Sequence, residues 1–404
     1  MGAIDYQQFV DPGRVPRMSK LDARMTFDAY PPPLERILGM WRKLESQPFK
    51  GVTSNGEVVP DLFSLRSNGA PVDSVAAAAM EWLESLPIHQ RAMAQLPLDA
   101  HTRRHWHNTP LVLRDGQLEF EALTHKQRDG ALEIVRRSLS AEGFARVLRV
   151  MENNELIGRL AQVEGLMNRR AFTMTVYGDP SSAEPWGWQM FGHHLALNVL
   201  FIGDQMVMSP VFLGLEPDVV DEKDGRRMFE PHEELALSFM RSLDEAQRGQ
   251  AVLYDSMLTA DQPEGRYHPD DGRHVGGAFQ DNRVVPYEGL DCSRLEARQQ
   301  DKLLALAQLF VGNLAAGPAR DVMDQLRRHL AATRFAWIGK VNDVDPFYFR
   351  IHSPVILIEM DHHNGIFLTN PEPERLHVHT IVRTPNGGDY GMALLRQHQK
   401  LEAG

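Results

Sequence analysis

The periodicity of the apolar residues changes near residue 172, and this change constrains the fold more than any other feature of the sequence. Before it, apolar residues recur at three- and four-residue steps, the pattern of one helix face. After it, short runs rich in β-branched and aromatic residues are separated by turn residues, which is typical of strands. The sequence therefore predicts an α+β fold, with a helical N-terminal half and a mostly antiparallel sheet with helices in the C-terminal half.

The expected elements follow from these two patterns. Helices are expected at residues 34–45, 72–85, 87–94, 123–138, 141–157, 227–247, 295–311, 318–331 and 390–399. Strands are expected at residues 172–177, 194–203, 205–212, 334–338, 346–351, 355–360, 366–369 and 377–382. Residues 254–290 are rich in Asp, Gly and Pro, and irregular segments of this length in a compact domain are usually functional or disordered.

The length of the chain predicts more than one structural unit. It has 404 residues, whereas a single core usually stops growing at roughly 250–300 residues. We expect an N-terminal arm at residues 1–33, a helical subdomain at 34–168 and an α+β subdomain at 169–404 that carries the site. The arm ends in three consecutive prolines, which are not expected to be helical.

Charge and cysteine content exclude several classes of protein. The formal net charge is −11 and no basic stripe is present, so no nucleic-acid partner is expected. The single cysteine, Cys292, can form neither an intrachain disulfide nor a thiolate cage, so any metal must be held by histidine and carboxylate. No apolar run approaches the ~18 residues of a spanning helix, and the first residues do not resemble a signal peptide. We therefore expect a cytoplasmic protein without a membrane partner, for which an oligomer is possible.

Two histidine pairs stand out in the expected sheet, His193-His194 and His377-Val-His379. Side chains alternate between the faces of a strand, so His194 shares a face with Asn198 while His193 points to the other. By the same rule His377 and His379 share one face. Imidazoles from two strands, together with a carboxylate, are the usual way for a cysteine-poor protein to bind a divalent ion such as zinc or iron. All four histidines are candidate ligands, and His194 is the better placed of its pair.

Other polar and aromatic residues are assigned to the same site. Glu216, Glu359 and Asp361 are the candidate carboxylates, of which Glu216 is assigned to the site together with Asn198. Arg383, in line with His377 and His379, is expected to orient a carboxylate or oxyanion of the substrate. The indoles of Trp186 and Trp188 are expected to wall an organic substrate, and His352 stands at a strand end, where site residues often lie.

Three further polar positions are given structural interpretations. Glu359 interrupts an apolar strand, so its carboxylate must be paired or exposed at an edge. The sequence Asp361-His-His-Asn-Gly ends in a strong turn signal, which favours a hairpin tip in solvent over a metal site. Asp389 is interpreted as a helix cap, with pairing to Arg383 as the alternative.

These residues support three hypotheses about function. The sequence contains no Gly-x-Ser-x-Gly elbow, no Walker loop and no dinucleotide fingerprint, so a serine hydrolase, a nucleotidase and a dinucleotide-dependent dehydrogenase are not expected. The first hypothesis is a metal-dependent hydrolase acting on a small organic substrate. The alternatives are a non-haem iron oxygenase with two histidines and one carboxylate, and a non-catalytic protein that binds a small molecule or a metal.

Several motifs are similar to those of a family catalogued as domain of unknown function 3500. They include Glu184-Pro-Trp-Gly-Trp-Gln, Gly192-His-His-Leu-Ala-Leu-Asn, Pro210-Val-Phe-Leu-Gly-Leu-Glu-Pro, Arg350-Ile-His-Ser-Pro and His377-Val-His-Thr-Ile-Val-Arg-Thr-Pro-Asn. The resemblance runs from about Leu34 to the end of the chain. It implies that the stretches assigned to a site on chemical grounds are also those by which the family is recognised, and it brings no activity with it. The spacing between Asn386 and Asp389 is slightly longer than is usual in the family.

Overall fold

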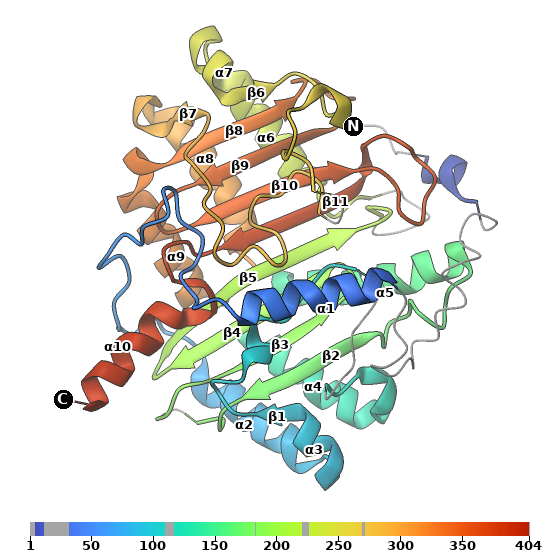
Figure 1. Ribbon diagram of the computed structural model, residues 1–404, viewed down its shortest axis with the longest axis vertical. Helices are drawn as coiled ribbons and strands as arrows, with labels where there is room; N and C mark the ends of the chain where they lie inside the picture. Colours follow the sequence, from blue (N-terminus) through green and yellow to red (C-terminus); the bar gives the residue numbers. More distant parts are fainter. Residues whose placement is uncertain are drawn as a thin grey trace.

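The structure is a computed structural model and describes residues 5–11, 32–109, 117–181, 183–219, 226–268 and 271–403. Most of the arm expected at residues 1–33 lies outside these ranges. Within them, eleven strands form a single sheet, shown in Figure 1. The pairings are antiparallel except for β1 with β2 and β6 with β8. The predicted α+β fold is therefore confirmed.

The strand order places the last strand of the chain beside the hairpin that follows His193 and His194. The order is β1-β2-β3-β4-β5-β11-β10-β9-β8-β6, with β7 paired to β8. The strands are β1 (Gln95–Leu96), β2 (Phe172–Tyr177), β3 (Trp186–Gly192), β4 (Leu195–Ile202), β5 (Gln205–Leu215), β6 (Val252–Tyr254), β7 (Leu290–Asp291), β8 (Arg334–Gly339), β9 (Phe347–His352), β10 (Leu357–His363) and β11 (Glu374–Arg383). The contact between β5 and β11 brings together the two histidine stretches, which are far apart in the sequence.

The helices surround this sheet. They are α1 (Pro32–Glu45), α2 (Val72–Glu84), α3 (Ile88–Ala94), α4 (His125–Ser138), α5 (Ala141–Ala161), α6 (Glu230–Ser242), α7 (Glu245–Ala251), α8 (Ala297–Val311), α9 (Ala316–Arg328) and α10 (Met392–Ala403). Thr124 caps α4 with Gln127 in the expected capping box, and the Ser140 hydroxyl caps α5. None of the described helices is both long and apolar enough to cross a membrane.

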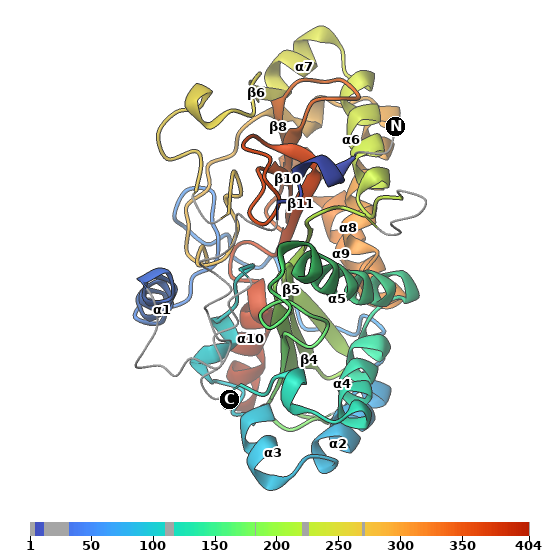
Figure 2. The same cartoon turned by 90° about the vertical axis from the view of Figure 1, so that its right-hand side faces the viewer.

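The two faces of the sheet are covered differently. Figure 2 shows α4, α5, α6 and α8 packed on one side, and α1 with long connecting segments on the other. On the helix side, Trp188, Met190, Leu213 and Val378 belong to one large apolar cluster that also includes residues of α2, α4 and α5. Burying each such side chain contributes roughly 1.5–3 kcal/mol, so this face supplies most of the hydrophobic stabilisation. The helices of residues 34–168 and the strands therefore share a core.

Four local expectations differ from the structure. Helix α1 begins at Pro32 rather than after the prolines, because the first N–H groups of a helix need no intrahelical partner. The helix expected at residues 227–247 is two helices, since Leu243 leaves the helix and Asp244 caps α7 in a capping box with Gln247. The strand expected to end at residue 360 continues to His363. Residues 366–369 form no strand, because the first three N–H groups bond to a buried carboxylate described below and that of Thr369 bonds to the Phe9 carbonyl.

Candidate metal centre

Three histidine rings converge on one point beside β5. His194 lies in the turn between β3 and β4, and His377 and His379 lie two residues apart on β11. The Nε2 atom of His379 is 3.0 Å from that of His377 and 3.1 Å from that of His194, and the third distance is 3.4 Å. All three side chains are buried. The structure thus brings together three of the four predicted ligands.

The spacing of these nitrogens matches a shared metal ion. Three nitrogens at about 2.0–2.1 Å from one ion would be about 3.4 Å apart in a tetrahedral site and about 3 Å apart at right angles. The observed distances of 3.0, 3.1 and 3.4 Å lie between these values. Each neutral imidazole has one N–H, so three converging nitrogens cannot all pair with one another by hydrogen bonds. A cation at their centre satisfies all three lone pairs.

The protonation of the rings suits this role. His377 Nδ1 lies 2.8 Å from the carbonyl oxygen of Asn364. Because a carbonyl only accepts, Nδ1 carries the proton and Nε2 presents its lone pair to the centre. Burial, and then the neighbouring histidines, hold the pKa values of His194 and His379 well below the usual value for histidine. The rings of His194 and His379 are therefore available as neutral ligands.

The backbone at His194 adopts a conformation that is rare for a residue with a side chain. Its φ angle is +60°, in the left-handed region. Such a residue costs of order 1–3 kcal/mol unless the surrounding structure fixes it, and strain of this kind clusters at ligand sites. Here it turns the ring of His194 toward His379 before β4 begins, which the strand alternation alone did not predict.

His193 and His363 form a second layer of rings around the three. His193 stacks on His194 with 3.8 Å between ring centroids, and its Nδ1 lies 2.9 Å from Asn154 Oδ1. His193 is therefore not one of the converging nitrogens. The ring of His363 lies 3.9 Å from that of His379, and its Nε2 is 3.2 Å from Asp361 Oδ2. The interpretation of His363 as part of a hairpin tip in solvent is wrong, because it is buried at the end of β10.

Glu216 holds a backbone segment next to the candidate metal centre. Its Oε1 accepts the backbone N–H groups of Ile366, Phe367 and Leu368 at 2.8, 3.1 and 3.0 Å, and lies 3.9 Å from His377 Nδ1. This nitrogen faces away from the converging Nε2 atoms, so the structure does not place Glu216 as a ligand with them. The carboxylate instead holds the segment that follows Asn364, whose carbonyl orients His377.

A loop over residues 271–281 covers the polar face of the sheet beside the histidines. Asp271 Oδ1 lies 3.8 Å from His379 Nδ1 and accepts the side-chain amide of Asn108 at 3.1 Å. Burial by itself lowers the pKa of His274, but Asp271 and the carboxylates of β10 outweigh it and raise the pKa to about 9. The loop thus adds an anion and a cation next to the three rings.

Arg383 and Asn198 are occupied by other protein groups. Arg383 is fully buried and donates to Asp281 at 3.1 Å, to Asp389 at 2.8 Å and to two carbonyls of the 271–281 loop. Its charge therefore fixes this loop, and Asp389 is its partner rather than a helix cap. Asn198 accepts from Gln189 at 2.8 Å and donates to the Pro210 carbonyl at 2.7 Å. Neither side chain reaches the converging nitrogens.

The two tryptophans and His352 lie elsewhere, which corrects their expected place in the site. Trp186 and Trp188 belong to the apolar cluster on the helix side of the sheet, and the indole of Trp188 donates to Ser138 at 3.1 Å. Strand alternation explains this placement, since both indoles are out of phase with the polar face. His352 is opposite Leu357 on β10, and His379 is opposite Asp361 on the same strand. Leu357 and Asp361 are four residues apart, so His352 lies about 13 Å from His379 along the strand direction.

Glu359 and Asp361 were already among the candidate carboxylates, and one sequence signal could have added His363 to them. Glu359, Asp361 and His363 alternate with Ile358 and Met360, so a strand through all five has one polar face. The register pairs Asp361 with His379, which puts this face next to the candidate ligands. Asp271 and His274 carry no such signal, because only the folded loop brings them over the sheet.

Comparisons with known proteins identify the family. Searches of curated proteins and of solved structures find no match. The family model described as "Protein of unknown function (DUF3500)" matches residues 68–392. The motifs quoted from Glu184 to Asn386 all fall within the matched range. The chain therefore belongs to the DUF3500 family.

Proposed function

We propose that His194, His377 and His379 bind one divalent metal ion and that the protein is a metal-dependent hydrolase acting on a small organic substrate. The observation that carries this proposal is the convergence of three Nε2 atoms, all at 3.0–3.4 Å from one another, in a buried setting. A bound divalent ion supplies a Lewis acid and lowers the pKa of a coordinated water to about 7. Catalytic zinc sites have three protein ligands and a fourth position that a water or the substrate occupies.

The donor set favours zinc over the iron alternative. Among the described residues, no carboxylate oxygen groups with all three nitrogens within 4.8 Å. The two-histidine, one-carboxylate set that non-haem iron oxygenases use is therefore not the set at these three histidines, although Glu45, His101 and His105 form such a group at the surface. Three imidazoles are a donor set of catalytic zinc.

The surrounding residues have definable tasks in this proposal. Asn364 fixes His377 through its carbonyl, and Asp271 Oδ1, 3.8 Å from His379 Nδ1, would accept a hydrogen bond from this nitrogen after an approach of less than an ångström. Partners of this kind raise the basicity of a ligating imidazole and fix its orientation. Because the three rings are buried, the reacting group of a substrate has to be small or extended.

Metal analysis of the purified protein tests the proposal. After expression in medium supplemented with zinc, iron and manganese, we expect close to one zinc per chain and its loss in His379→Ala. His329→Ala removes a half-buried histidine whose Nδ1 bonds to a helix carbonyl and serves as the matched control, with unchanged zinc. Equal metal content in His379→Ala and the unaltered protein would contradict the proposed site.

Catalysis is tested separately from metal binding. The zinc-loaded protein is assayed against esters, amides and lactones with small acyl groups, before and after treatment with a chelator. Hydrolysis that disappears on chelation and returns with zinc supports the hydrolase. Stoichiometric zinc without hydrolysis of any of these bonds favours the non-catalytic alternative, and iron with oxygen consumption favours an oxygenase.

A further inference from the structure

A hollow lined by several arginines lies away from the candidate metal centre. It has a volume of about 750 Å³ and lies between the end of α1, the segment from Leu98 to Arg104 and α10. This volume is in the range of pockets that hold small organic ligands. Trp106, Phe212 and Tyr390 belong to an aromatic cluster between this hollow and the candidate metal centre. The hollow is therefore a separate site.

Arg103 in the wall of this hollow is a buried cation without a carboxylate partner among the described residues. It is 8% exposed, and its guanidinium donates to the carbonyls of Leu98 at 3.2 Å and Tyr390 at 2.8 Å. Burial lowers the pKa of Arg103 to about 10. A buried charge held only by neutral groups costs several kcal/mol in general, which a bound anion would offset.

Two further arginines face the hollow. Arg104 donates to Asp281 at 2.9 Å and to the Gln47 carbonyl at 3.2 Å, but its Nη2 is buried and has no hydrogen-bond partner in the described chain. Arg396 on α10 donates to the Phe49 carbonyl at 2.6 Å. Both guanidinium groups lie over the Phe49 ring, at 5.5 and 5.9 Å from its centroid.

The acidic groups near the hollow leave these cations available. Glu45 also lines the hollow, and among the described residues it contacts His105 at 2.6 Å and His101 at 3.4 Å rather than an arginine. Asp99 stands at the exposed rim. Asp281 serves Arg383 as well as Arg104. Among the described residues, the three arginines of the lining therefore have one ion-pair partner, Asp281, which contacts Arg104.

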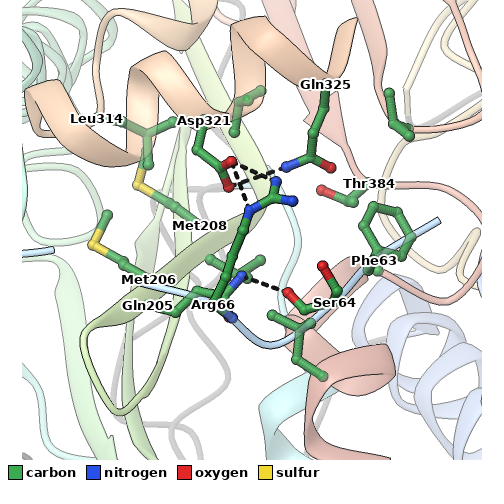
Figure 3. Close-up of a pocket in the computed structure, with 15 residues that line it drawn as sticks. Phe63, Ser64, Arg66, Gln205, Met206, Met208, Leu314, Asp321, Gln325 and Thr384 are labelled. Atoms are coloured by element: carbon green, nitrogen blue, oxygen red, sulfur yellow. Dashed lines mark hydrogen bonds and ion pairs between the residues drawn. The ribbon is translucent and has the colours of Figure 1, made fainter. Parts of the chain in front are cut away.

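The cavity in Figure 3 shows the opposite arrangement. There Arg66 points directly at Asp321, with its Nε and Nη2 at 3.1 and 2.5 Å from one carboxylate oxygen, and Gln325 donates to the other oxygen. The space for a ligand is only about 50 Å³. This arginine is compensated within the protein, whereas Arg103 is not.

We propose that the larger hollow binds a small organic anion, with Arg103, Arg104 and Arg396 holding a carboxylate or phosphate group and Phe49, Leu98 and Met392 contacting its apolar part. Arginine forks match both anions, because two parallel N–H donors fit two oxygens of either group. The proposal is independent of the metal centre and holds whether or not the protein is a hydrolase.

Methionine methyl NMR on the full chain tests this proposal. Protein labelled at methionine methyl groups is titrated with inorganic phosphate, and separately with benzoate, at constant ionic strength and with the metal removed. We expect a saturable shift of the Met392 signal, assigned from Met392→Leu, with no shift of Met323, which is buried in the helix-side core. Phosphate as the better probe identifies a phosphate ligand, and benzoate as the better probe identifies an aromatic or apolar carboxylate.

Two variants on one helix show whether the arginines are responsible. Arg396→Gln should weaken binding of the better probe by about tenfold, the effect of losing one charge-assisted hydrogen bond. Lys400→Gln removes a cation from the exposed surface of the same helix, outside the lining of the hollow, and should leave binding unchanged. Absence of any Met392 shift in the folded protein, or equal weakening by both variants, would overturn the proposal.

Discussion

At the scale of single residues, the candidate metal centre depends on a glycine as much as on its histidines. Gly214 on β5 pairs with His379 on β11. A Cβ atom at this position would lie 2.9 Å from the Val378 carbonyl, 3.0 Å from His379 Cδ2 and 3.3 Å from His194 Cδ2. Because glycine has no side chain, the rings of His194 and His379 can occupy the space beside this position.

Gly214→Ala should therefore damage the metal centre. Because the new methyl group meets backbone on one side and both rings on the other, we expect a loss of about 1–3 kcal/mol in the free energy of unfolding and at least tenfold weaker zinc binding. Chemical denaturation and competition with a zinc chelator measure the two effects. Gly249→Ala is the control, since a Cβ there meets nothing within 4 Å and should add about 0.5–1 kcal/mol of stability to α7. Undiminished zinc affinity in Gly214→Ala would separate the glycine from the site.

His232 in α6 predicts how stability responds to acid. It is 1% exposed between Phe229 and Phe310, and burial, followed by the charge of Arg146, lowers its pKa to about 3. In the unfolded chain the pKa is about 6.5, so between these values the unfolded state binds more protons. The contribution of His232 to the free energy of unfolding therefore falls as the pH falls, by about 2 kcal/mol between pH 7 and pH 5.

Replacing this histidine should flatten the acid side of the stability profile. We expect the difference in unfolding free energy between His232→Gln and the unaltered protein to change by about 2 kcal/mol from pH 7 to pH 5, in favour of the variant. Denaturation series across this pH range measure it. His125→Gln removes an exposed histidine of α4, and its profile should follow that of the unaltered protein. Parallel profiles for both variants would show that His232 titrates normally.

At the scale of elements, the loop over residues 271–281 is held on the sheet by carboxylates that point out of β10. Glu359 accepts the N–H groups of Val275 at 2.9 Å and Gly276 at 2.7 Å, and the hydroxyl of Tyr348 at 2.5 Å. Asp361 accepts the N–H of Arg273 at 2.8 Å. The expectation that a carboxylate within an apolar strand must be paired or at an edge is met by pairing.

Glu359→Gln should release this loop locally. The amide group would face one of the three donors with another donor, and a buried donor left without an acceptor costs about 1–3 kcal/mol. We expect faster hydrogen exchange in peptides covering residues 271–281, with the helix-side strands unchanged. Glu133→Gln on α4 is the control, because its carboxylate pairs with Arg136 and Arg137 at the surface and such pairs contribute about 0–1 kcal/mol. Unaltered exchange in the 271–281 peptides would show that other contacts hold the loop.

The helices and most strands were predictable because their signals are local. The capping box at Thr124 and the hairpin of β4 and β5 needed only neighbouring residues. The strand β3 was not predicted, although Trp186, Trp188 and Met190 alternate with Gly187 and Gln189, because its two glycines weaken the strand signal. The Asn-Gly turn signal ended β10 too early, because turn propensity competes there with pairing to β11 through His363.

At the scale of the whole molecule, the two faces of the sheet carry different kinds of residues. Its helix side carries the large apolar cluster and one buried group of charged residues, Glu233 with Arg227, His362 and Arg375, whereas its other side carries histidines, carboxylates and arginines under long loops. Alternation along β11 sufficed to predict that the side chains of His377 and His379 lie on the same face of the sheet. Alternation also places the indole of Trp186 on the helix side once β3 is recognised, but it could not supply Asp271, because only the folded loop brings that residue over the sheet. The centre is therefore a property of the assembled sheet.

Metal removal should lower the stability of the whole fold. His194 is 183 and 185 residues from the other two histidines in the sequence, so the set of three exists only when β4, β5 and β11 are assembled. A ligand that binds only the folded state adds about 2.7 kcal/mol at a free concentration one hundred times its Kd.

Zinc should therefore raise the Tm of the chelated protein by several degrees, in a concentration-dependent way, and calorimetry of the two states measures the shift. His379→Ala should start from a similar Tm without metal and gain little from zinc, whereas His329→Ala should gain as much as the unaltered protein. An equal gain in His379→Ala would mean that zinc stabilises the protein from another site, and no gain in the unaltered protein would mean that the folded sheet does not bind it. Because the shift in Tm reports metal binding through the stability of the fold, the experiment distinguishes these outcomes without a known substrate.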